Sequence, residues 1–231
     1  MKPLVIFDLD GTLVDTPSGI VKAFIAGLDS MGIPFTDAQA IRATIGLPLE
    51  KAFSQLLGIP VDDVQVGLAV RQYQAAFREI VLPQARALVF PGVVDGLKAL
   101  KGQGYSLAVA TSKVFTSAQA LLDAANLWPF FDLVVGADMV SQPKPHPEMG
   151  LLVMSRLGNS PANSVVVGDT THDLLMAKQA GIHAIGVTWG IHDREKLQTA
   201  EPGWIVDSFD EVVNTAHSIL LKAPVTAVNT P

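Results

Sequence analysis

Five short apolar runs are the feature that most constrains how this chain folds. The runs are Leu4–Phe7, Ser106–Ala110, Leu133–Val135, Ser164–Val167 and Ala184–Val187. Runs that are apolar almost throughout suit strands that are buried on both faces of a sheet. Helical patterns separate the runs. Strands that alternate with helices predict an α/β fold, with a doubly wound parallel sheet and right-handed crossovers.

One long interval of the chain carries no strand-like run. After the first run, and as far as Phe90, the apolar periodicity predicts helices alone, the first with Thr16 as its N-cap and Pro17 at its first position. The further helices expected there are Asp37–Thr44, Leu49–Leu57 and Asp63–Val81. The expected parts of the chain are a core of residues 1–15 and 88–220, an inserted all-helical subdomain of residues 16–87, and a flexible tail of residues 221–231.

Composition and charge narrow the partners of this chain. Its formal net charge is −6 and it has no basic block, which argues against nucleic acid because binding to the phosphate backbone needs clustered Lys and Arg. It has no cysteine, and no segment reads as a signal peptide or a membrane helix. We therefore expect a cytoplasmic protein with no membrane partner. The sequence leaves monomer and homodimer equally open.

Polar side chains follow the predicted strands at the points where the strands end. They are Asp8 and Asp10 after the first run, Thr111 and Ser112 after the second, Lys144 near the end of the third crossover, and Asp169 and Asp173 after the fourth. Because ligands of open α/β sheets bind beyond the carboxyl ends of the strands, we expect these side chains to meet at one edge. Four carboxylates close together need a cation, and a hard divalent ion such as Mg²⁺ prefers their oxygen atoms.

The expected acidic cluster points to phosphoryl transfer. A metal ion between Asp8 and Asp169 would keep the first carboxylate ionised, so that it can act as a nucleophile on phosphorus. Lys144 and the Thr111 hydroxyl would hold the phosphoryl oxygens of the resulting aspartyl-phosphate. Asp10 would protonate the leaving alcohol and then deprotonate the attacking water. The residues predict a Mg²⁺-dependent hydrolase of a small phosphorylated metabolite.

Several segments resemble the motifs of a known superfamily. DLDGTLVDT, AVATSK, KPHP and VGDTTHD are similar, in this order, to the four motifs of the haloacid dehalogenase superfamily, and the helical insert resembles its class I cap. Two longer segments, PGVVDGLKALKGQGYSLAVATSK and KPHPEMGLLVMSRLG, resemble phosphoglycolate phosphatases and their near relatives. The resemblance implies a Rossmann-like core, phosphatase activity and Mg²⁺ as the cofactor.

The resemblance also implies a role for each matching residue. The implied roles are nucleophile and metal ligand for Asp8, acid/base catalyst and carbonyl ligand for Asp10, metal ligand for Asp169, phosphate binding for Thr111, Ser112 and Lys144, and orientation of water or of Lys144 for Asp173. In the dehalogenases of this superfamily the position of Asp10 is not Asp and the metal is absent. The acidic set of this chain therefore favours phosphate chemistry over carbon–halogen cleavage.

The helical insert is expected to select the substrate. Its loop Thr44–Pro48 breaks two helices and is expected to face the site, so that Thr44 and Gly46 are candidate substrate contacts. Relatives that isomerise sugar phosphates place an arginine close after this glycine. Its absence here weakens a phosphomutase interpretation. The insert cations that could meet a substrate carboxylate are Arg42, Lys51, Arg71 and Arg78.

Simpler explanations exist for several of these residues. Asp-Gly is a common turn signal, and both Asp169 and Asp173 can cap the helix that follows them. A loop lysine is ordinarily solvated and a threonine is common in strands. Lys113 is a weaker candidate for a phosphate or substrate contact. Packing or peripheral roles are expected for His146, His172, Trp189 and Trp204.

Other activities fit the same set of residues. The preferred substrate is 2-phosphoglycolate, and a pyrophosphatase or a sugar-phosphate phosphatase would use the same mechanism. A receiver-like phospho-signalling module also combines acidic residues, Mg²⁺, a Thr and a Lys on a doubly wound sheet, and it stores the aspartyl-phosphate. Such modules are much shorter than this chain. They lack both a large insert and an acid/base Asp two residues after the nucleophile.

Overall fold

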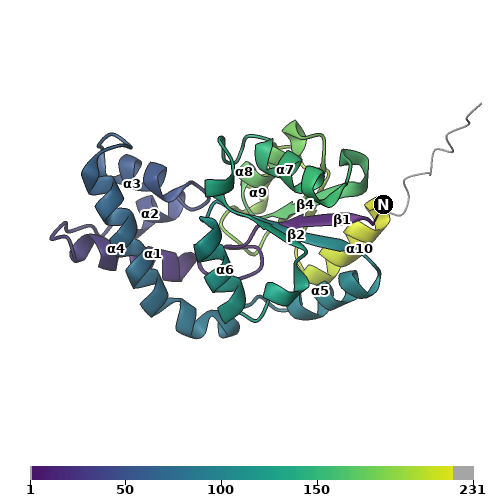
Figure 1. Ribbon diagram of the computed structural model, residues 1–231, viewed down its shortest axis with the longest axis horizontal. Coiled ribbons are helices and arrows are strands. Elements are labelled where there is room, and N and C mark those ends of the chain that lie inside the picture. The colour runs from purple at the N-terminus through teal and green to yellow at the C-terminus, as the bar shows by residue number, and fades with distance from the viewer. Residues whose placement is uncertain (1, 221–231) are drawn as a thin grey trace, which may run out of the picture.

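The computed structural model describes residues 2–220, and the expected tail of residues 221–231 lies outside the described residues. Its centre is a six-stranded sheet in the order β3-β2-β1-β4-β5-β6 (Figure 1). The strands are β1 Leu4–Phe7, β2 Ser106–Ala110, β3 Leu133–Val135, β4 Ser164–Gly168, β5 His183–Val187 and β6 Trp204–Val206. Every neighbouring pair is parallel, which confirms the predicted doubly wound α/β sheet.

Strand β1 lies in the middle of the sheet because its residues are apolar on both faces. Val5 and Phe7 belong to the hydrophobic cluster on one face, while Leu4 and Ile6 belong to the cluster on the other. All four side chains are fully buried. In the register, Phe7 pairs with Val109 of β2 and with Val167 of β4. The residues that follow these three strands therefore begin side by side.

Helices cover both faces of the sheet. The helices of the core are α5 Val93–Gly102, α6 Phe115–Ala124, α7 Glu148–Leu157, α8 Thr171–Gln179, α9 Arg194–Gln198 and α10 Phe209–Leu220. Short 3₁₀ segments occur at Leu82–Leu88, Trp128–Phe130, Ala137–Met139 and Pro161–Asn163. Buried side chains of α5, α6 and α10 join the cluster that contains Phe7, and those of α7, α8 and α9 join the cluster that contains Ile6.

The interval between β1 and β2 begins with a helical insert, as the sequence predicts. Its helices are α1 Pro17–Asp29, α2 Ala38–Ala43, α3 Leu49–Leu57 and α4 Val64–Ile80. The insert has an aromatic centre in which the Phe24 ring lies 4.5 Å from that of Phe53 and 4.7 Å from that of Tyr73, measured between centroids. Figure 1 shows these helices together at the end of the sheet toward which β1 runs. The borders at residues 16 and 87 stay predictions.

One expected helix cap lacks its hydrogen bond, and one strand was missed. Thr16 stands at the N-cap position of α1 as predicted, with Pro17 after it, but its hydroxyl donates to Asp10 Oδ1 at 2.6 Å and makes no capping hydrogen bond to the helix backbone. Strand β6 has three residues at the edge of the sheet, and Trp204 is 40% exposed there, so it lacks the apolar run of a buried strand. Among residues 2–220, no helix is both long and apolar enough to cross a lipid bilayer.

Candidate active site

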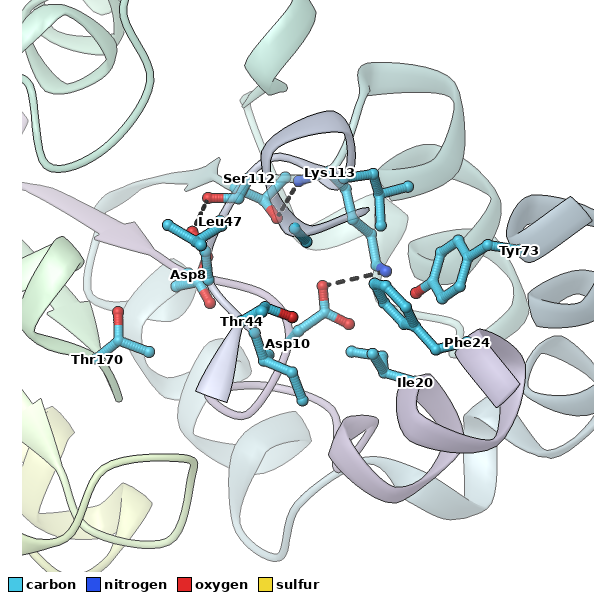
Figure 2. A pocket seen from close by; sticks show the side chains of 15 residues that line it. Asp8, Asp10, Ile20, Phe24, Thr44, Leu47, Tyr73, Ser112, Lys113 and Thr170 are labelled. Atoms are coloured by element: carbon cyan, nitrogen blue, oxygen red, sulfur yellow. Dashed lines mark hydrogen bonds and ion pairs between the residues drawn. The ribbon is translucent and has the colours of Figure 1, made fainter. Parts of the chain in front are cut away.

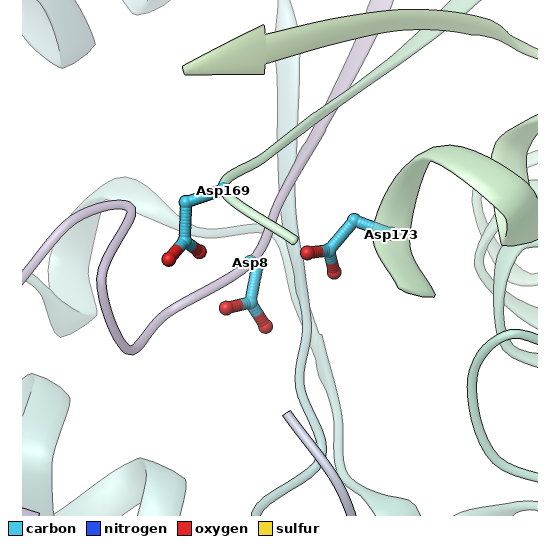
Figure 3. Close-up of side chains that lie close together, drawn as sticks. All are labelled: Asp8, Asp169 and Asp173. Carbon is cyan, nitrogen blue, oxygen red and sulfur yellow. The ribbon is translucent and has the colours of Figure 1, made fainter. Parts of the chain in front are cut away.

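Asp8, Asp169 and Asp173 converge beyond the carboxyl ends of β1 and β4. Each offers a carboxylate oxygen, and these oxygens all lie within 4.8 Å of one another (Figure 3). Asp8 is 8% exposed, and the other two are fully buried or nearly so. The Asp8 N–H continues the strand ladder by donating to the Val167 carbonyl at 2.9 Å. The sheet therefore places the predicted nucleophile beside the carboxylate of the neighbouring strand.

Lys144 enters the acidic cluster from the loop before α7. Its Nζ atom donates to Asp8 Oδ1 at 2.8 Å and also donates to Asp173 Oδ1. The residue is only 4% exposed, so its ammonium group depends on these carboxylates for charge compensation. An ammonium group has three protons, and the two hydrogen bonds leave one free. The structure thus places Lys144 where the third proton can reach a group that is bonded to Asp8.

Asp173 is held by its own helix as well as by Lys144. Thr170 stands at the N-cap of α8, and its N–H and hydroxyl both donate to Asp173 Oδ2, at 3.1 and 2.7 Å. This capping box confirms that Asp173 serves the helix terminus. Because its other oxygen accepts from Lys144, Asp173 fixes the position of the lysine. The structure therefore confirms the capping role of Asp173, and its contact with Lys144 is compatible with the predicted functional role.

Asp169 is held by two donors that the sequence did not reveal. The Thr12 hydroxyl donates to its Oδ1 atom and the Ile191 N–H donates to its Oδ2 atom, both at 2.8 Å. Gly11 has φ +82° and faces the same carboxylate so closely that a β-carbon there would overlap it. In the sequence, the Gly11-Thr12 pair after Asp10 is the one feature that points to the Thr12 contact. No sequence pattern predicts the Ile191 contact, because its donor is a backbone N–H.

Burial and mutual repulsion perturb the charges of the cluster. Burial, and then the Asp173 and Asp169 carboxylates, raise the pKa of Asp8 well above its ordinary value, although Lys144 opposes the shift. Burial and the Asp173 carboxylate raise the pKa of Asp169 to about 7. Burial lowers the pKa of Lys144, but the carboxylates of Asp173 and Asp8 outweigh it and the net shift is upward. Three carboxylates against one ammonium leave a negative site that suits a cation.

The cluster fits a hard divalent cation. Its donors are carboxylate oxygens, which Mg²⁺ and Ca²⁺ prefer, and they are close enough together to share one ion. Both oxygens of Asp173 accept protein hydrogen bonds, one of them from the Lys144 ammonium. The two donors to Asp169 are neutral groups, so its charge is not offset by a protein cation, and Asp8 accepts from Lys144 at one oxygen only. Asp8 and Asp169 are therefore the better candidates for metal ligands. Asp173 is the better candidate for the residue that positions Lys144.

The Asp10 side chain lies apart from the acidic cluster. It accepts from the Thr16 hydroxyl and forms an ion pair with Lys113 Nζ at 3.3 Å (Figure 2). The ammonium group of Lys113 also lies 4.1 Å from the centroid of the Phe77 ring, which belongs to the insert. Asp10 and Lys113 are thus the charged pair that faces the insert. The contacts of Lys113 with Asp10 and Phe77 were not predicted from the sequence.

Thr111 and Ser112 follow β2 and line the same cavity as Asp8. Thr111 is buried, and its hydroxyl oxygen accepts from the Lys113 N–H at 3.2 Å, which leaves its proton free to donate. Ser112 behaves differently, because its hydroxyl donates to the Gly46 carbonyl of the insert at 2.7 Å. This bond ties the core to the insert beside the site. A phosphate contact by either residue stays a prediction.

The loop between α2 and α3 reaches the site as predicted. Thr44 and Gly46 both line the cavity, although the Thr44 hydroxyl donates to its own backbone at the Ile41 carbonyl, 2.7 Å away. Gly46 has φ +101°, and a β-carbon there would lie 3.3 Å from His172 Nδ1. The insert cations that were expected to meet a substrate carboxylate are placed differently from this loop. Arg42, Lys51 and Arg71 are exposed and do not line this cavity.

The remaining aromatic and imidazole side chains have packing or supporting positions. Trp189 Nε1 donates to the Thr12 carbonyl at 3.2 Å, so Trp189 braces the loop that holds Asp169. The Nδ1 atom of His172 is buried and has no hydrogen-bond partner within residues 2–220. Burial lowers the pKa of His172. The Nδ1 atom of His146 accepts from the Glu148 N–H at 3.3 Å, at the start of α7.

Known proteins are similar to this chain in sequence and in fold. A family model described as haloacid dehalogenase-like hydrolase matches residues 5–187. A protein named probable phosphatase IndB, from Dickeya dadantii, is 72% identical over 220 residues, which cover 95% of this chain and 96% of that protein. A phosphoglycolate phosphatase from Salmonella paratyphi A is 32% identical over 229 residues, with 90% of each chain covered. The crystal structure of a predicted phosphatase from Clostridium acetobutylicum gives a TM-score of 0.82 at 27% identity, over 94% of this chain and 99% of that one.

Proposed function

Because the chain belongs to the haloacid dehalogenase-like hydrolase family, we propose that it is a Mg²⁺-dependent phosphatase that hydrolyses a small phosphorylated metabolite through an aspartyl-phosphate on Asp8. The observation that carries the proposal is the position of Asp8. It ends the central strand, borders the cavity, and lies in one buried cluster with Asp169, Asp173 and Lys144. The relative of 72% identity is named as a phosphatase, which supports the same reaction class.

The first step forms a bond between an Asp8 carboxylate oxygen and phosphorus, while the bond from phosphorus to the ester oxygen breaks. Asp10 gives a proton to the departing alcohol. In the second step a water loses a proton to Asp10 and attacks phosphorus, which frees Asp8 and releases phosphate. The carboxylates of Asp8 and Asp169 and the Asp10 carbonyl would hold Mg²⁺, which would supply positive charge to offset the phosphoryl oxygens.

The different surroundings of Asp8 and Asp10 support their different roles. Asp8 sits among carboxylates and Lys144, where a cation keeps it ionised as a nucleophile. Asp10 faces the insert and has its own partners, the Thr16 hydroxyl and the Lys113 ammonium. A leaving alcohol beneath the insert therefore meets Asp10 first. This separation lets two carboxylates that are two residues apart in the sequence act on opposite sides of phosphorus.

Thr111, Ser112 and Lys144 are the proposed phosphate-binding groups. Thr111 keeps a free hydroxyl proton, and Lys144 keeps one free ammonium proton beside Asp8. Ser112 uses its hydroxyl on Gly46, so its contribution is the backbone N–H. Donors that are fixed before the substrate arrives stabilise charge on the transferring group without reorganisation. The reaction is proposed to take place in the cytoplasm, on a metabolite and not on nucleic acid.

The proposed substrate class still contains several members. The name of the Salmonella relative supports 2-phosphoglycolate, and a pyrophosphatase or sugar-phosphate phosphatase would use the same residues. A phosphomutase is less well supported because Leu47, Pro48 and Leu49 follow the loop glycine where an arginine would be needed. A receiver-like module is disfavoured by the insert over the site and by Asp10 beside the leaving group.

Phosphate release from a substrate panel tests this proposal. The panel contains 2-phosphoglycolate, pyrophosphate, nucleoside monophosphates and hexose phosphates, each with Mg²⁺, with EDTA, and with the Asp8→Asn variant. We expect turnover that requires Mg²⁺ and is lost in Asp8→Asn, while Asp123→Asn, an exposed change on α6, keeps full activity. Full turnover by Asp8→Asn would show that the nucleophile lies elsewhere. Slow decay of a stable phospho-Asp8 would support the signalling module.

A further inference from the structure

The insert side of the cavity beside Asp8 carries no charge. The insert residues that line this cavity are Ile20, Phe24, Thr44, Ile45, Gly46, Leu47, Leu49, Ala52 and Tyr73. All of its charged lining residues come from the core: Asp8, Asp10 and Lys113. The space is small, about 50 Å³, so it suits the transferring phosphoryl group. The leaving group then has to extend beyond it, along the insert.

A second cavity adjoins the first at the boundary between insert and core. Its volume is about 180 Å³, and it shares Leu49, Tyr73 and Lys113 with the first cavity. Its other lining residues are Gln74, Phe77, Arg78 and Leu82 from the insert side and Val114, Thr116, Ser117 and Ala120 around the start of α6. These side chains are apolar, or polar and uncharged, apart from Arg78. The second cavity is larger than the first, and the charged residues among those that line it are Lys113 and Arg78.

Neither of the two cations beside these cavities is both buried and unpaired: Lys113 is buried but paired, and Arg78 is exposed to water, which screens its charge. Lys113 Nζ is already paired with Asp10 and stacked on the Phe77 ring, and its side chain is 10% exposed. Arg78 is exposed at the outer boundary, and its Nε atom donates to the Gln74 carbonyl at 3.1 Å. A carboxylate or a second phosphate in this space would lose its hydration without gaining an unpaired buried cation. Burial of such a charge is unfavourable.

Neutral groups, in contrast, find partners in the second cavity. The Phe77 ring and the side chains of Leu82, Val114 and Ala120 offer apolar surface. Figure 2 shows the Tyr73 hydroxyl pointing toward Lys113 at the boundary between the cavities. Gln74, Thr116 and Ser117 add neutral hydrogen-bonding groups. This mixture is typical of sites that bind an uncharged molecule with an apolar body and a few polar atoms.

We propose that the substrate is a phosphate monoester of an uncharged alcohol, and that the apolar body of this alcohol occupies the second cavity beyond Lys113 and Tyr73. The proposal rests on the phosphatase function proposed above and narrows its substrate class. It predicts a lower kcat/KM for substrates whose leaving group is anionic, such as 2-phosphoglycolate and pyrophosphate. Larger monoesters whose leaving alcohol is uncharged should have a higher kcat/KM.

Matched pairs of substrates and a cavity-filling variant test this assignment. Ethyl phosphate is the reference, 2-phosphoglycolate adds a carboxylate to it, and benzyl phosphate adds an apolar ring. We expect kcat/KM for benzyl phosphate to exceed that for ethyl phosphate by about 10- to 100-fold, and 2-phosphoglycolate to fall below ethyl phosphate. Ala120→Phe fills the second cavity, so it should remove most of the benzyl preference while ethyl phosphate turnover stays unchanged.

Two control variants keep this test specific. Gln119→Phe adds the same ring one position away on α6, outside the residues that line the cavity, and should keep the benzyl preference. Arg78→Gln should not lower kcat/KM for 2-phosphoglycolate relative to that for ethyl phosphate. The assignment is overturned if 2-phosphoglycolate is the best of the three, if Arg78→Gln selectively lowers its turnover, or if Ala120→Phe keeps the benzyl preference. Failure to hydrolyse any phosphate ester with Mg²⁺ would instead overturn the phosphatase function, and the assignment with it.

Discussion

The two sides of the active-site cavity differ in the charge and polarity of their side chains. The core side consists of buried charged groups at strand ends, each held by protein hydrogen bonds, as Asp169 is by Thr12 and Ile191. The insert side consists of apolar or neutral side chains on helices, such as Phe24 and Tyr73. The core fixes charges in place for the reaction. We propose that the insert excludes water and selects the leaving group.

Two of the contacts that join these sides involve the segment after β2. The Ser112 hydroxyl donates to the Gly46 carbonyl, and the Lys113 ammonium lies over the Phe77 ring while it pairs with Asp10. A movement of the insert relative to the core would therefore act on Ser112 and Lys113 and, through Lys113, on Asp10, the proposed proton donor. We therefore expect changes in the charged groups of the core side to alter kcat. Changes on the insert side, or in the hydrogen bonds that join the insert to the core, should alter KM and substrate preference.

Asp8→Asn should have the largest effect, because the amide removes the nucleophile from the core side. We expect kcat to fall by at least about 10⁴-fold on every substrate. Since Asn also removes a carboxylate whose pKa burial raises, we expect the melting temperature of the metal-free variant to equal or exceed that of the parent. Steady-state kinetics and thermal unfolding measure both effects. A loss of activity that comes with a lower melting temperature would mean misfolding and not lost chemistry.

Asp10→Asn should have the next largest effect and should depend on the leaving group. We expect kcat to fall by about 10²- to 10⁴-fold for alkyl phosphates, whose alcohols need a proton to leave. The loss should be much smaller in the formation of phospho-Asp8 from p-nitrophenyl phosphate, whose phenolate leaves without one. Presteady-state release of nitrophenol makes the comparison. Equal losses with both leaving groups would remove the acid role from Asp10.

The metal-free protein should become less stable as the pH rises, and Mg²⁺ should reverse this. The folded pKa of Asp169 is about 7, above the value of roughly 3.9 expected when unfolded. Between these values the unfolded chain binds fewer protons, so the free energy of unfolding decreases as the pH rises through this window. Mg²⁺ at 100 times its Kd adds about 2.7 kcal/mol. Because metal ligands must be ionised, the gain should be larger at pH 8 than at pH 5.

Thermal unfolding at both pH values, with and without Mg²⁺, checks this expectation. In Asp169→Asn the amide cannot ionise, so stability should decrease less with pH and the Mg²⁺ response should become weak. An equal Mg²⁺ response in this variant and the parent would place the ion elsewhere.

Ser112→Ala should have the smallest effect, because it removes a single neutral hydrogen bond between core and insert. Such a bond contributes about 0.5–1.5 kcal/mol, so we expect KM to rise by roughly 2- to 10-fold with little change in kcat. Ser30→Ala is the matched control, since its hydroxyl donates to the Gly27 carbonyl at 2.7 Å within the insert and away from the cavity. A similar rise in KM in both variants would show that the effect is one of general stability.

The core side could be predicted from sequence because its residues follow recognisable strands. Chain order and the parallel topology place the ends of β1, β2 and β4 together, so Asp8, Thr111 and Asp169 could be brought to one edge from sequence alone. The helices of the insert were also predicted, because Gly58 and the acidic N-caps Asp37 and Asp63 are strong local signals.

The interaction of the two sides could not be predicted in the same way. The Thr16 hydroxyl had two possible partners, a helix N–H from which it could accept and the Asp10 carboxylate to which it could donate, and only the folded chain decides between them. The Ile191 N–H on Asp169 is a backbone group that any residue supplies. Lys113 shows no local pattern, since its partners Asp10 and Phe77 come from distant parts of the sequence. Contacts of this kind arise from tertiary packing.

Detection of the phosphorylated enzyme tests the central claim most directly. Enzyme in excess over a hydrolysable substrate is quenched in acid at successive times, and the peptide that contains Asp8 is examined by mass spectrometry. We predict a phosphoryl adduct on Asp8 that forms and decays before or with the release of phosphate, and that is absent in Asp8→Asn. Phosphate release without an adduct at any time, or an adduct on a different residue, would contradict the assignment of Asp8 as the nucleophile.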